Sequence, residues 1–212
     1  MPIDSIARAK ISAKINRSVN LTMSSILTND PDLFVGNNTG QMIQARGGND
    51  VIRAGAGDDT ISGSAGNDAI NGGAGNDRID GGDGSDKIQG GEGSDRMKGG
   101  AGNDTFFFNK GQISNDSAQG LLDHIIDFQG AGGYAAEQDF IRFEGFGVGS
   151  TFTYARAATE HRNGAIYEVY DTTDGSIVEI LIEFADNNYT GTMQLLGAAH
   201  GSSVNNADFG WL

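Results

Sequence analysis

The chain has 212 residues, of which 34 are glycine, 2 are proline and none is cysteine, and its formal net charge is −14. Glycine without a three-residue period excludes collagen, and the lack of cysteine excludes disulfides and thiol catalysis. The negative charge disfavours nucleic acid and anionic membranes as partners and suits cation binding. No apolar run reaches the length of a membrane-spanning helix.

Residues 1–35 carry the least information. Ile3, Ile6, Ile11 and Ile15 partly fit the spacing of a basic amphipathic helix. We favour a short helix that caps the segment after it, with a membrane- or partner-binding segment and disorder as the alternatives. The region lacks the apolar core of a cleaved secretory signal.

A nine-residue repeat follows. It is well formed over residues 45–107, with a degenerate leader at 36–44 that has Gln41 where an aspartate belongs. A flexible linker would not keep an apolar residue in phase for seven periods. Position 6 of the repeats holds Asp50, Asp59, Asp68, Asp77, Asp86, Asp95 and Asp104. Position 8 holds Ile52, Ile61, Ile70, Ile79, Ile88, Met97 and Phe106.

The period predicts a stack of coils. We expect the first six residues of each repeat to turn and the last three to form a strand, whose middle side chain alone points inward. One inward apolar residue per repeat makes a core only when repeats stack. Because two repeats make one coil, two stacks are predicted. One contains Ile52, Ile70, Ile88 and Phe106, and the other contains Ile61, Ile79 and Met97.

The turn composition predicts bound calcium. Glycines at positions 1, 2 and 4 allow positive φ and expose backbone carbonyls. Successive turns stack about 4.8 Å apart, so aspartates one coil apart repel one another unless a cation lies between them. Calcium takes about six to eight oxygen ligands, which carboxylates and carbonyls of adjacent turns supply, whereas magnesium prefers a tighter octahedron. The repeats therefore indicate a calcium-binding and not a catalytic architecture.

These repeats resemble the GGxGxDxUx nonapeptides of the RTX (repeats-in-toxin) family of secreted bacterial proteins. The resemblance implies a parallel β-roll in which each ion lies between a loop and the loop one coil on. The position-6 aspartates and the carbonyls of positions 1 to 4 hold the ion. Pairing the loops that start at 45/63, 54/72, 63/81, 72/90 and 81/99 gives about five Ca²⁺ sites.

The ligand set implied by the resemblance is the seven position-6 aspartates together with loop carbonyls. These carbonyls belong to Gly63, Ala65, Gly66, Gly72, Gly73, Ala74, Gly75, Gly81, Gly82, Asp83, Gly84, Gly90, Gly91, Glu92, Gly93, Gly99, Gly100 and Gly102. Ala45, Arg46, Ala54 and Ser64 depart from the motif. With only the Gln41 leader before it, Asp50 is expected to matter less than Asp77.

After residue 107 period-2 segments replace the glycine repeat, at 123–129, 139–146, 150–157, 165–184 and 192–197. The turn at 171–176 predicts a hairpin within 165–184. We expect a mostly antiparallel sheet or sandwich that covers the open end of the roll. The expected organisation is an N-terminal cap segment (1–35), a roll (36–107) and a C-terminal β domain (108–212), an all-β fold with a short N-terminal helix.

The C-terminal part resembles the C-terminal domain of serralysin-type metalloproteases. The matching residues are Asp123, Ile125, Asp127, Phe128, Asp139 and Ile141. The resemblance implies an uncleaved export signal for a type I (ABC-transporter) apparatus, and the chain end carries such a pattern in Asp208, Phe209, Trp211 and Leu212. The insertion at 129–137 departs from the family spacing and leaves a further calcium site at Asp127 or Asp139 open.

No enzymatic constellation is found in the sequence. His124, His161 and His200 form no H-E-x-x-H zinc motif, and no G-x-S-x-G elbow occurs. We therefore predict a non-catalytic, secreted, extracellular calcium-binding RTX protein, with a complete reading frame favoured by Met1. The alternatives are the accessory or secretion module of a larger enzyme (a serralysin-like protease or an alginate epimerase) and a surface adhesin that contacts cell surfaces or carbohydrate.

Overall fold

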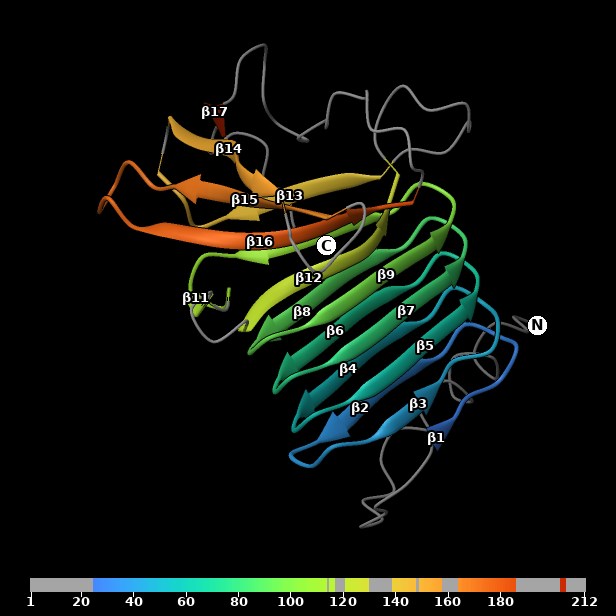
Figure 1. Cartoon of the computed structure of the whole chain (residues 1–212). Helices are drawn as coiled ribbons and strands as arrows, with labels where there is room; N and C mark the ends of the chain where they lie inside the picture. The colour runs from blue at the N-terminus through green and yellow to red at the C-terminus, as the bar shows by residue number, and fades with distance from the viewer. Residues whose placement is uncertain are drawn as a thin grey trace, which may run out of the picture.

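The computed structural model describes residues 25–113, 115–116, 121–129, 139–147, 149–157, 164–185 and 203–204, and every regular element in these ranges is a β-strand (Figure 1). The predicted strand at 192–197, the export pattern at 208–212 and most of the predicted N-terminal helix lie outside the described residues. Within the described residues, no helix is long and apolar enough to cross a membrane.

The repeats form a parallel β-roll with two sheets, as the sequence predicts. The coils run up the stack in Figure 1 from the blue N-terminal end to the green strands. The strands of the first sheet's parallel part are β1 (Ser25–Ile26), β3 (Met42–Gln44), β5 (Thr60–Ala65), β7 (Arg78–Asp83), β9 (Arg96–Ala101) and β12 (Leu121–Phe128). Those of the second sheet are β2 (Leu33–Asn37), β4 (Val51–Ala56), β6 (Ala69–Ala74), β8 (Lys87–Glu92), β10 (Thr105–Asn109) and β13 (Phe140–Glu144).

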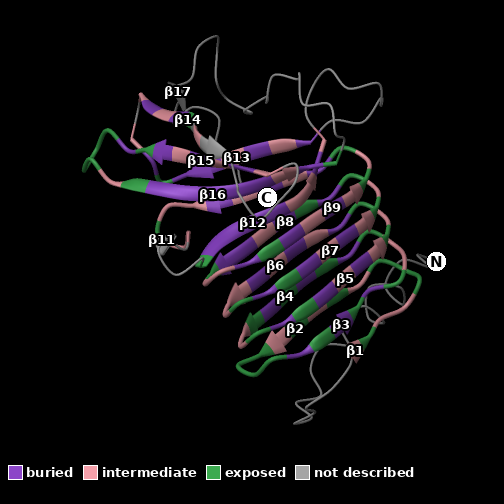
Figure 2. Cartoon of the chain, viewed as in Figure 1, coloured by how far each residue is buried: buried purple, intermediate pink, exposed green. Residues whose placement is uncertain are grey.

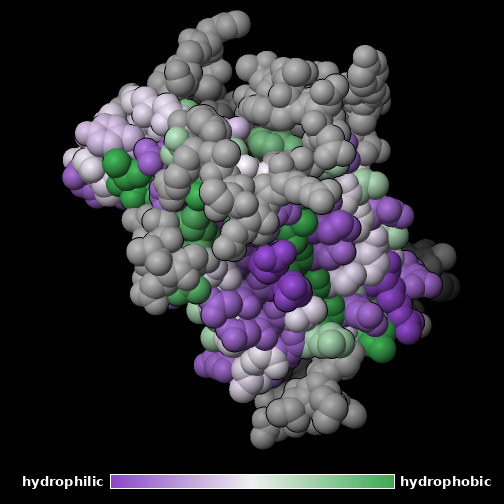
Figure 3. Space-filling model, viewed as in Figure 1, coloured by the Kyte–Doolittle hydropathy of each residue, from purple (hydrophilic) through white to green (hydrophobic). Residues whose placement is uncertain are grey.

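Both predicted apolar stacks are confirmed. Ile52 pairs with Ile70, Ile70 with Ile88, and Ile88 with Phe106 in the second sheet. Ile61, Ile79 and Met97 are paired in the same way in the first. All of these side chains are buried, and burial alternates along the strands (Figure 2). The space-filling view shows many hydrophilic residues over the roll (Figure 3).

The strands are longer than predicted. A typical roll strand, β7, covers six residues, because it continues from the last three positions of one repeat into the first three of the next. It therefore has two inward positions, Ile79 and Gly81, both of them buried. The predicted length of three residues was wrong, because the leading glycines stay paired with the neighbouring strand and do not turn away from the sheet. Gly82, for example, pairs with Gly100.

The C-terminal strands close one end of the roll. β12 and β13 are still parallel to their roll neighbours β9 and β10, and β16 (Ile177–Phe184) continues the parallel part beside β12. Antiparallel pairs then join β16 to β15 (Gly164–Tyr170) and β15 to β14 (Ser150–Ala157), and the short strands β11 (Asn115–Asp116) and β17 (Ser203–Val204) pair antiparallel with β12 and β14. The predicted hairpin is the β15–β16 pair, joined by residues 171–176. Lys110, just after β10, bonds Asp171 and Asp174 of that turn and so ties it to the roll.

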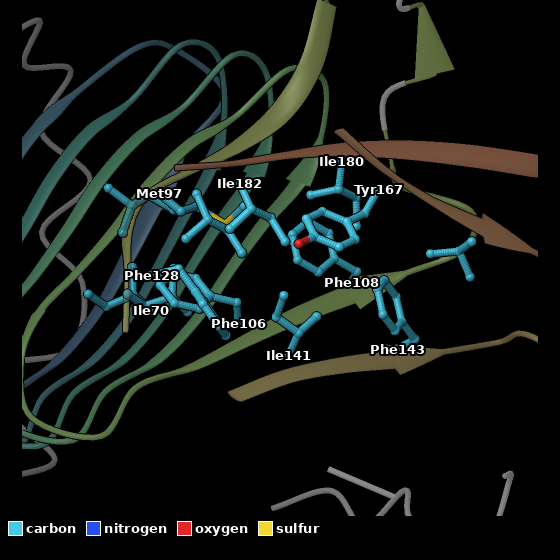
Figure 4. Packing of buried hydrophobic residues seen from close by; sticks show 14 of the residues in the cluster. Ile70, Met97, Phe106, Phe108, Phe128, Ile141, Phe143, Tyr167, Ile180 and Ile182 are labelled. Carbon is cyan, nitrogen blue, oxygen red and sulfur yellow. The ribbon is translucent and has the colours of Figure 1, made fainter. Parts of the chain in front are cut away.

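An aromatic core continues the isoleucine stacks beneath these strands (Figure 4). The rings of Phe106 and Phe128 lie 6.2 Å apart between centroids, and Phe152 stacks on Tyr167 at 5.0 Å. Aromatic rings here fill the positions that a single isoleucine fills in the regular repeats, and they pack against one another. The roll end is thus covered by apolar packing, as edge protection requires.

Candidate calcium sites

The position-6 aspartates form two continuous hydrogen-bonded ladders inside the turns. In each, the Oδ1 atom accepts a hydrogen bond from the backbone N–H of the aspartate one coil earlier. Asp59 N–H donates to Asp77 at 2.8 Å, and Asp77 N–H donates to Asp95 at 2.8 Å. In the other ladder Asp68 N–H donates to Asp86 at 2.8 Å. One oxygen of each carboxylate therefore fixes the register of the stack.

The second carboxylate oxygen has a different environment. All seven position-6 aspartates are at most 2% exposed. The Oδ2 atom is buried and accepts no hydrogen bond within the described residues in Asp50, Asp59, Asp68, Asp77, Asp86 and Asp95. A buried carboxylate oxygen without a donor costs several kcal/mol or takes up a proton or a metal ion. Such a row of oxygens, one per coil, is the arrangement that a chain of cations between coils satisfies.

Glycine at position 1 makes room for this oxygen. A Cβ added at Gly72 would lie 2.2 Å from Asp77 Oδ2 and 2.7 Å from the carbonyl oxygen of Gly90, one coil on. Position 1 is not in the positive-φ region, contrary to the prediction, whereas positions 2 and 4 are, as at Gly73 (φ 114°) and Gly75 (φ 138°). The position-1 glycines are needed for space beside the carboxylate and not for backbone freedom.

The predicted carbonyl ligands lie on the backbone of the glycine loops. In the described part of the chain no three histidine or carboxylate side chains converge on one point, so side chains alone do not complete a calcium shell. The position-3 carbonyls of Ala74, Asp83 and Glu92 accept hydrogen bonds of 2.6 to 2.8 Å from Gly57, Gly66 and Gly75 one coil earlier. A carbonyl oxygen has two lone pairs, so these predicted ligands keep one for an ion.

The electrostatics of the ladders disfavour bare carboxylates. Burial, reinforced by the neighbouring aspartates of the same ladder, raises the pKa of Asp77 and Asp86 to about 7. Burial likewise raises the pKa of Asp50 and Asp95 to about 6. The backbone hydrogen bond to Oδ1 opposes this shift without cancelling it. Without a cation, the folded roll therefore holds protons that the unfolded chain releases.

We predict that acid partly replaces calcium. In the unfolded chain these carboxyls have a pKa of 3.8, so between that value and about 7 the folded state binds more protons. Stability then falls as pH rises through this window. In excess chelator, lowering the pH from about 8 to about 5 should increase the β signal in far-UV circular dichroism. Loss of β signal on this acidification would contradict the burial of the ladders.

The ladders extend beyond the repeats at both ends. Asp95 N–H donates to Asp123 Oδ1, and Asp104 N–H donates to Asp139 Oδ1, both at 3.0 Å. At the other end Asp32 N–H donates to Asp50 Oδ1 at 2.7 Å. Asp123 and Asp139 thus occupy position 6, although the five residues before each of them in the sequence lack the glycines of positions 1, 2 and 4. The signal in the sequence is the apolar residue two positions later, since Ile125 pairs with Met97 and Ile141 with Phe106.

The structure corrects the place of the leader. Gln41 lies one coil before Asp59 and not one coil before Asp50. Its backbone N–H donates a hydrogen bond of 2.7 Å to Asp59 Oδ1. Partners are 18 residues apart, so adjacent repeats belong to opposite ladders. The Gln41 side chain is neutral, and its Oε1 accepts a hydrogen bond from Asn37 N–H at 3.0 Å. The first position of this ladder is therefore an amide side chain, where the later coils have a carboxylate.

Asp127 has a role that differs from both ladders. Its two oxygens accept hydrogen bonds from the N–H groups of Gly99 and Gly100 at 2.9 and 3.0 Å. The carboxylate therefore binds the last glycine loop directly. Asp127 therefore holds this loop through two backbone hydrogen bonds, whereas Asp139 is the last aspartate of a ladder.

Comparison with protein families agrees with the repeat pattern. The model of the RTX calcium-binding nonapeptide repeat, in four copies, matches residues 44–79 and 80–112. Residues 44–112 are RTX calcium-binding nonapeptide repeats. Among solved structures the chain is similar to the AlgE6R3 subunit of the mannuronan C5-epimerase from Azotobacter vinelandii, with 22% identity over 87% of this chain and 97% of that one and a TM-score of 0.29. No curated protein matches the chain.

Proposed function

We propose that this protein is a non-catalytic, extracellular calcium-binding protein whose RTX roll folds when Ca²⁺ binds. The observation that carries the proposal is the row of buried Oδ2 atoms that lack hydrogen-bond donors in both ladders. The ions would lie between loops one coil apart, held by Asp68, Asp77, Asp86 and their ladder neighbours with the carbonyls of the glycine loops. The RTX repeats support calcium as the metal.

Calcium would act as a folding switch. Where calcium is scarce, buried like charges and the entropy of the glycine-rich loops oppose folding, which leaves a chain suited to passage through a type I exporter. Outside the cell, ions that bind only the native state add their binding free energy to stability. Extracellular calcium modules have dissociation constants of about 10⁻⁴ to 10⁻³ M, which suits such a switch.

Calcium titration tests the switch. In chelator at about pH 8, where the raised pKa values no longer favour protonation, we expect little β signal in far-UV circular dichroism. Added Ca²⁺ at about millimolar concentration should restore it, and Mg²⁺ at the same concentration should restore much less because it prefers a tighter octahedron with bound water. A spectrum unchanged between chelator and calcium, with no metal in the dialysed protein, would refute the proposal.

The non-catalytic assignment rests on how the acids are presented. The repeat carboxylates are buried, one per coil in each ladder, whereas hydrolysis needs an acid and a base in reach of substrate. His124 is buried in β12, with its Nε2 3.3 Å from Glu183 Oε1, in a strand and not in a metal motif. Assays of the purified protein on casein and on ester substrates, with and without zinc, test this assignment, and zinc-dependent cleavage would overturn it.

We further propose that export depends on the C-terminus. Residues 208–212 lie outside the described residues, and the proposal rests on their acidic-then-apolar pattern. Deleting residues 208–212 should leave the chain in the cytoplasm of a strain with a matching exporter, while the purified product keeps its calcium response. Normal secretion of the truncated chain would exclude a terminal signal.

A further inference from the structure

A groove with a volume of about 360 Å³ lies on the outer face of the second sheet. Residues at positions 7 and 9 of the repeats line it, because the apolar residue between them points into the roll. Successive strands place Arg53, Asn71, Gln89, Phe107 and Arg142 side by side in register. The groove therefore runs across the strands, along the axis of the roll.

Cationic side chains recur in this groove at a regular interval. Arg53 lies on β4, Lys87 on β8 and Arg142 on β13, and the order of strands in the sheet is β13, β10, β8, β6, β4. Every second strand thus contributes one cation, and these strands lie about 9.6 Å apart when neighbouring strands are about 4.8 Å apart. Lys87 lies two residues before the row that contains Arg53 and Arg142, so the three cations alternate about the axis of the groove. Among the described lining residues, Glu144 alone is acidic, and it is buried at the β13 end, two residues from Arg142. Three cations in one groove are notable in a chain with a net charge of −14.

The strands between the cations present groups that suit sugars. On β10 the Arg142 guanidinium lies over the ring of Phe107, 5.8 Å from the ring centroid, so an aromatic ring and a cation are presented together. Asn71 donates a side-chain hydrogen bond to Gln89 at 3.3 Å, and Gln89 donates to Gln112 at 2.8 Å. A side-chain amide has two N–H groups, so each donor keeps a second one for a hydroxyl or carboxylate oxygen.

We propose that this groove binds an extended acidic polysaccharide whose carboxylates face the protein at every second sugar. The cations match an acid that recurs once per two sugars, the amides match hydroxyls, and the ring of Phe107 matches the apolar face of a pyranose. A nucleic acid fits less well, because each strand of a duplex carries a phosphate about every 3.4 Å of helix axis, and the net negative charge of the protein repels these phosphates. The inference requires the folded roll, and hence calcium if the proposed switch holds.

Calorimetric titration with hyaluronan oligosaccharides tests the groove, because their acidic and neutral sugars alternate. The full chain is titrated in calcium, and circular dichroism first verifies that it is folded, which separates failure of the groove from failure of the calcium switch. We expect binding that weakens with added salt, and no binding of neutral cellulose oligosaccharides of equal length. The double variant Arg53→Gln/Lys87→Gln should weaken binding about tenfold or more, since two charge contacts are lost.

The matched control is Arg78→Gln/Arg96→Gln, which removes the same charge from neighbouring exposed residues of the first sheet. Its affinity should change less than about twofold, because long-range attraction is screened at physiological salt. Equal weakening by both double variants would show general attraction and overturn the groove. So would absence of binding by the folded protein, equal binding of the neutral sugar, or equal binding of single-stranded DNA.

Discussion

Replacing Asp77 with asparagine is expected to shift folding in opposite directions with and without calcium. Asparagine keeps an oxygen for the hydrogen bond from Asp59 N–H but carries no charge. In calcium, the loss of a carboxylate flanked on both sides by others should raise the calcium midpoint about tenfold or more. In chelator, removing a buried charge whose pKa is raised to about 7 should make the neutral-pH fold more stable.

Asp83→Asn is the control for this experiment. Asp83 belongs to the next repeat but is exposed, and the substitution keeps its backbone carbonyl. Its calcium midpoint should change by less than about twofold, as for most surface substitutions. Calcium titrations followed by circular dichroism, and urea unfolding in chelator at about pH 7, measure the two effects. Equal midpoints for the two variants would show that the ladder does not bind calcium.

Replacing Gly84 with alanine is expected to prevent folding of the roll even in calcium. Gly84 has φ 137°, and an added Cβ would lie 2.1 Å from the carbonyl oxygen of Gly66 on the coil before. The backbone conformation alone costs about 1–3 kcal/mol for alanine, and the collision between coils adds to it. Gly111→Ala is the control, since nothing lies within 4 Å of its Cβ.

The two glycine variants should differ clearly in thermal unfolding followed by circular dichroism in calcium. Gly111→Ala should stay within about 0.5 kcal/mol of the parent chain. Position 2 offers an internal comparison, because Arg46 and Ser64 occupy it at φ 72° and 76°, in the left-handed region that non-glycine residues tolerate. In all seven repeats position 4 is glycine. A Gly84→Ala chain as stable as Gly111→Ala would show that the loops are built differently.

The repeat made the roll predictable from sequence. A strict period fixes which side chains stack, so the pairing of Ile52 with Ile70 and of Ile61 with Ile79 followed from counting alone. The length of the strands could not be predicted in this way. The residues at position 2 have a positive φ and still pair with the neighbouring strand, a combination that glycine adopts most easily. The leader was misplaced for a simpler reason. The leader that contains Gln41 directly precedes the repeat of Asp50 in the sequence, but Gln41 is hydrogen-bonded to Asp59 in the structure.

The ends of the ladders could not be derived from the period. The chain between Asp95 and Asp123 is 28 residues long, and that between Asp104 and Asp139 is 35, so counting in units of 18 misses both partners. Likewise, the groove on the second sheet depends on which side chains share a face several strands apart. The spacing of Arg53, Lys87 and Arg142 in the sheet becomes visible only when β13 is placed beside β10.

The location of the ions tests the account most directly. Crystals grown in calcium, measured at a wavelength where calcium scatters anomalously, would show each ion as a peak in the anomalous difference map. We predict two rows of peaks inside the turns, each beside the Oδ2 atoms of successive ladder aspartates, including Asp68, Asp77, Asp86 and Asp95. A folded roll with no peak along these rows, or with its only peaks on the outer surface, would contradict the central claim.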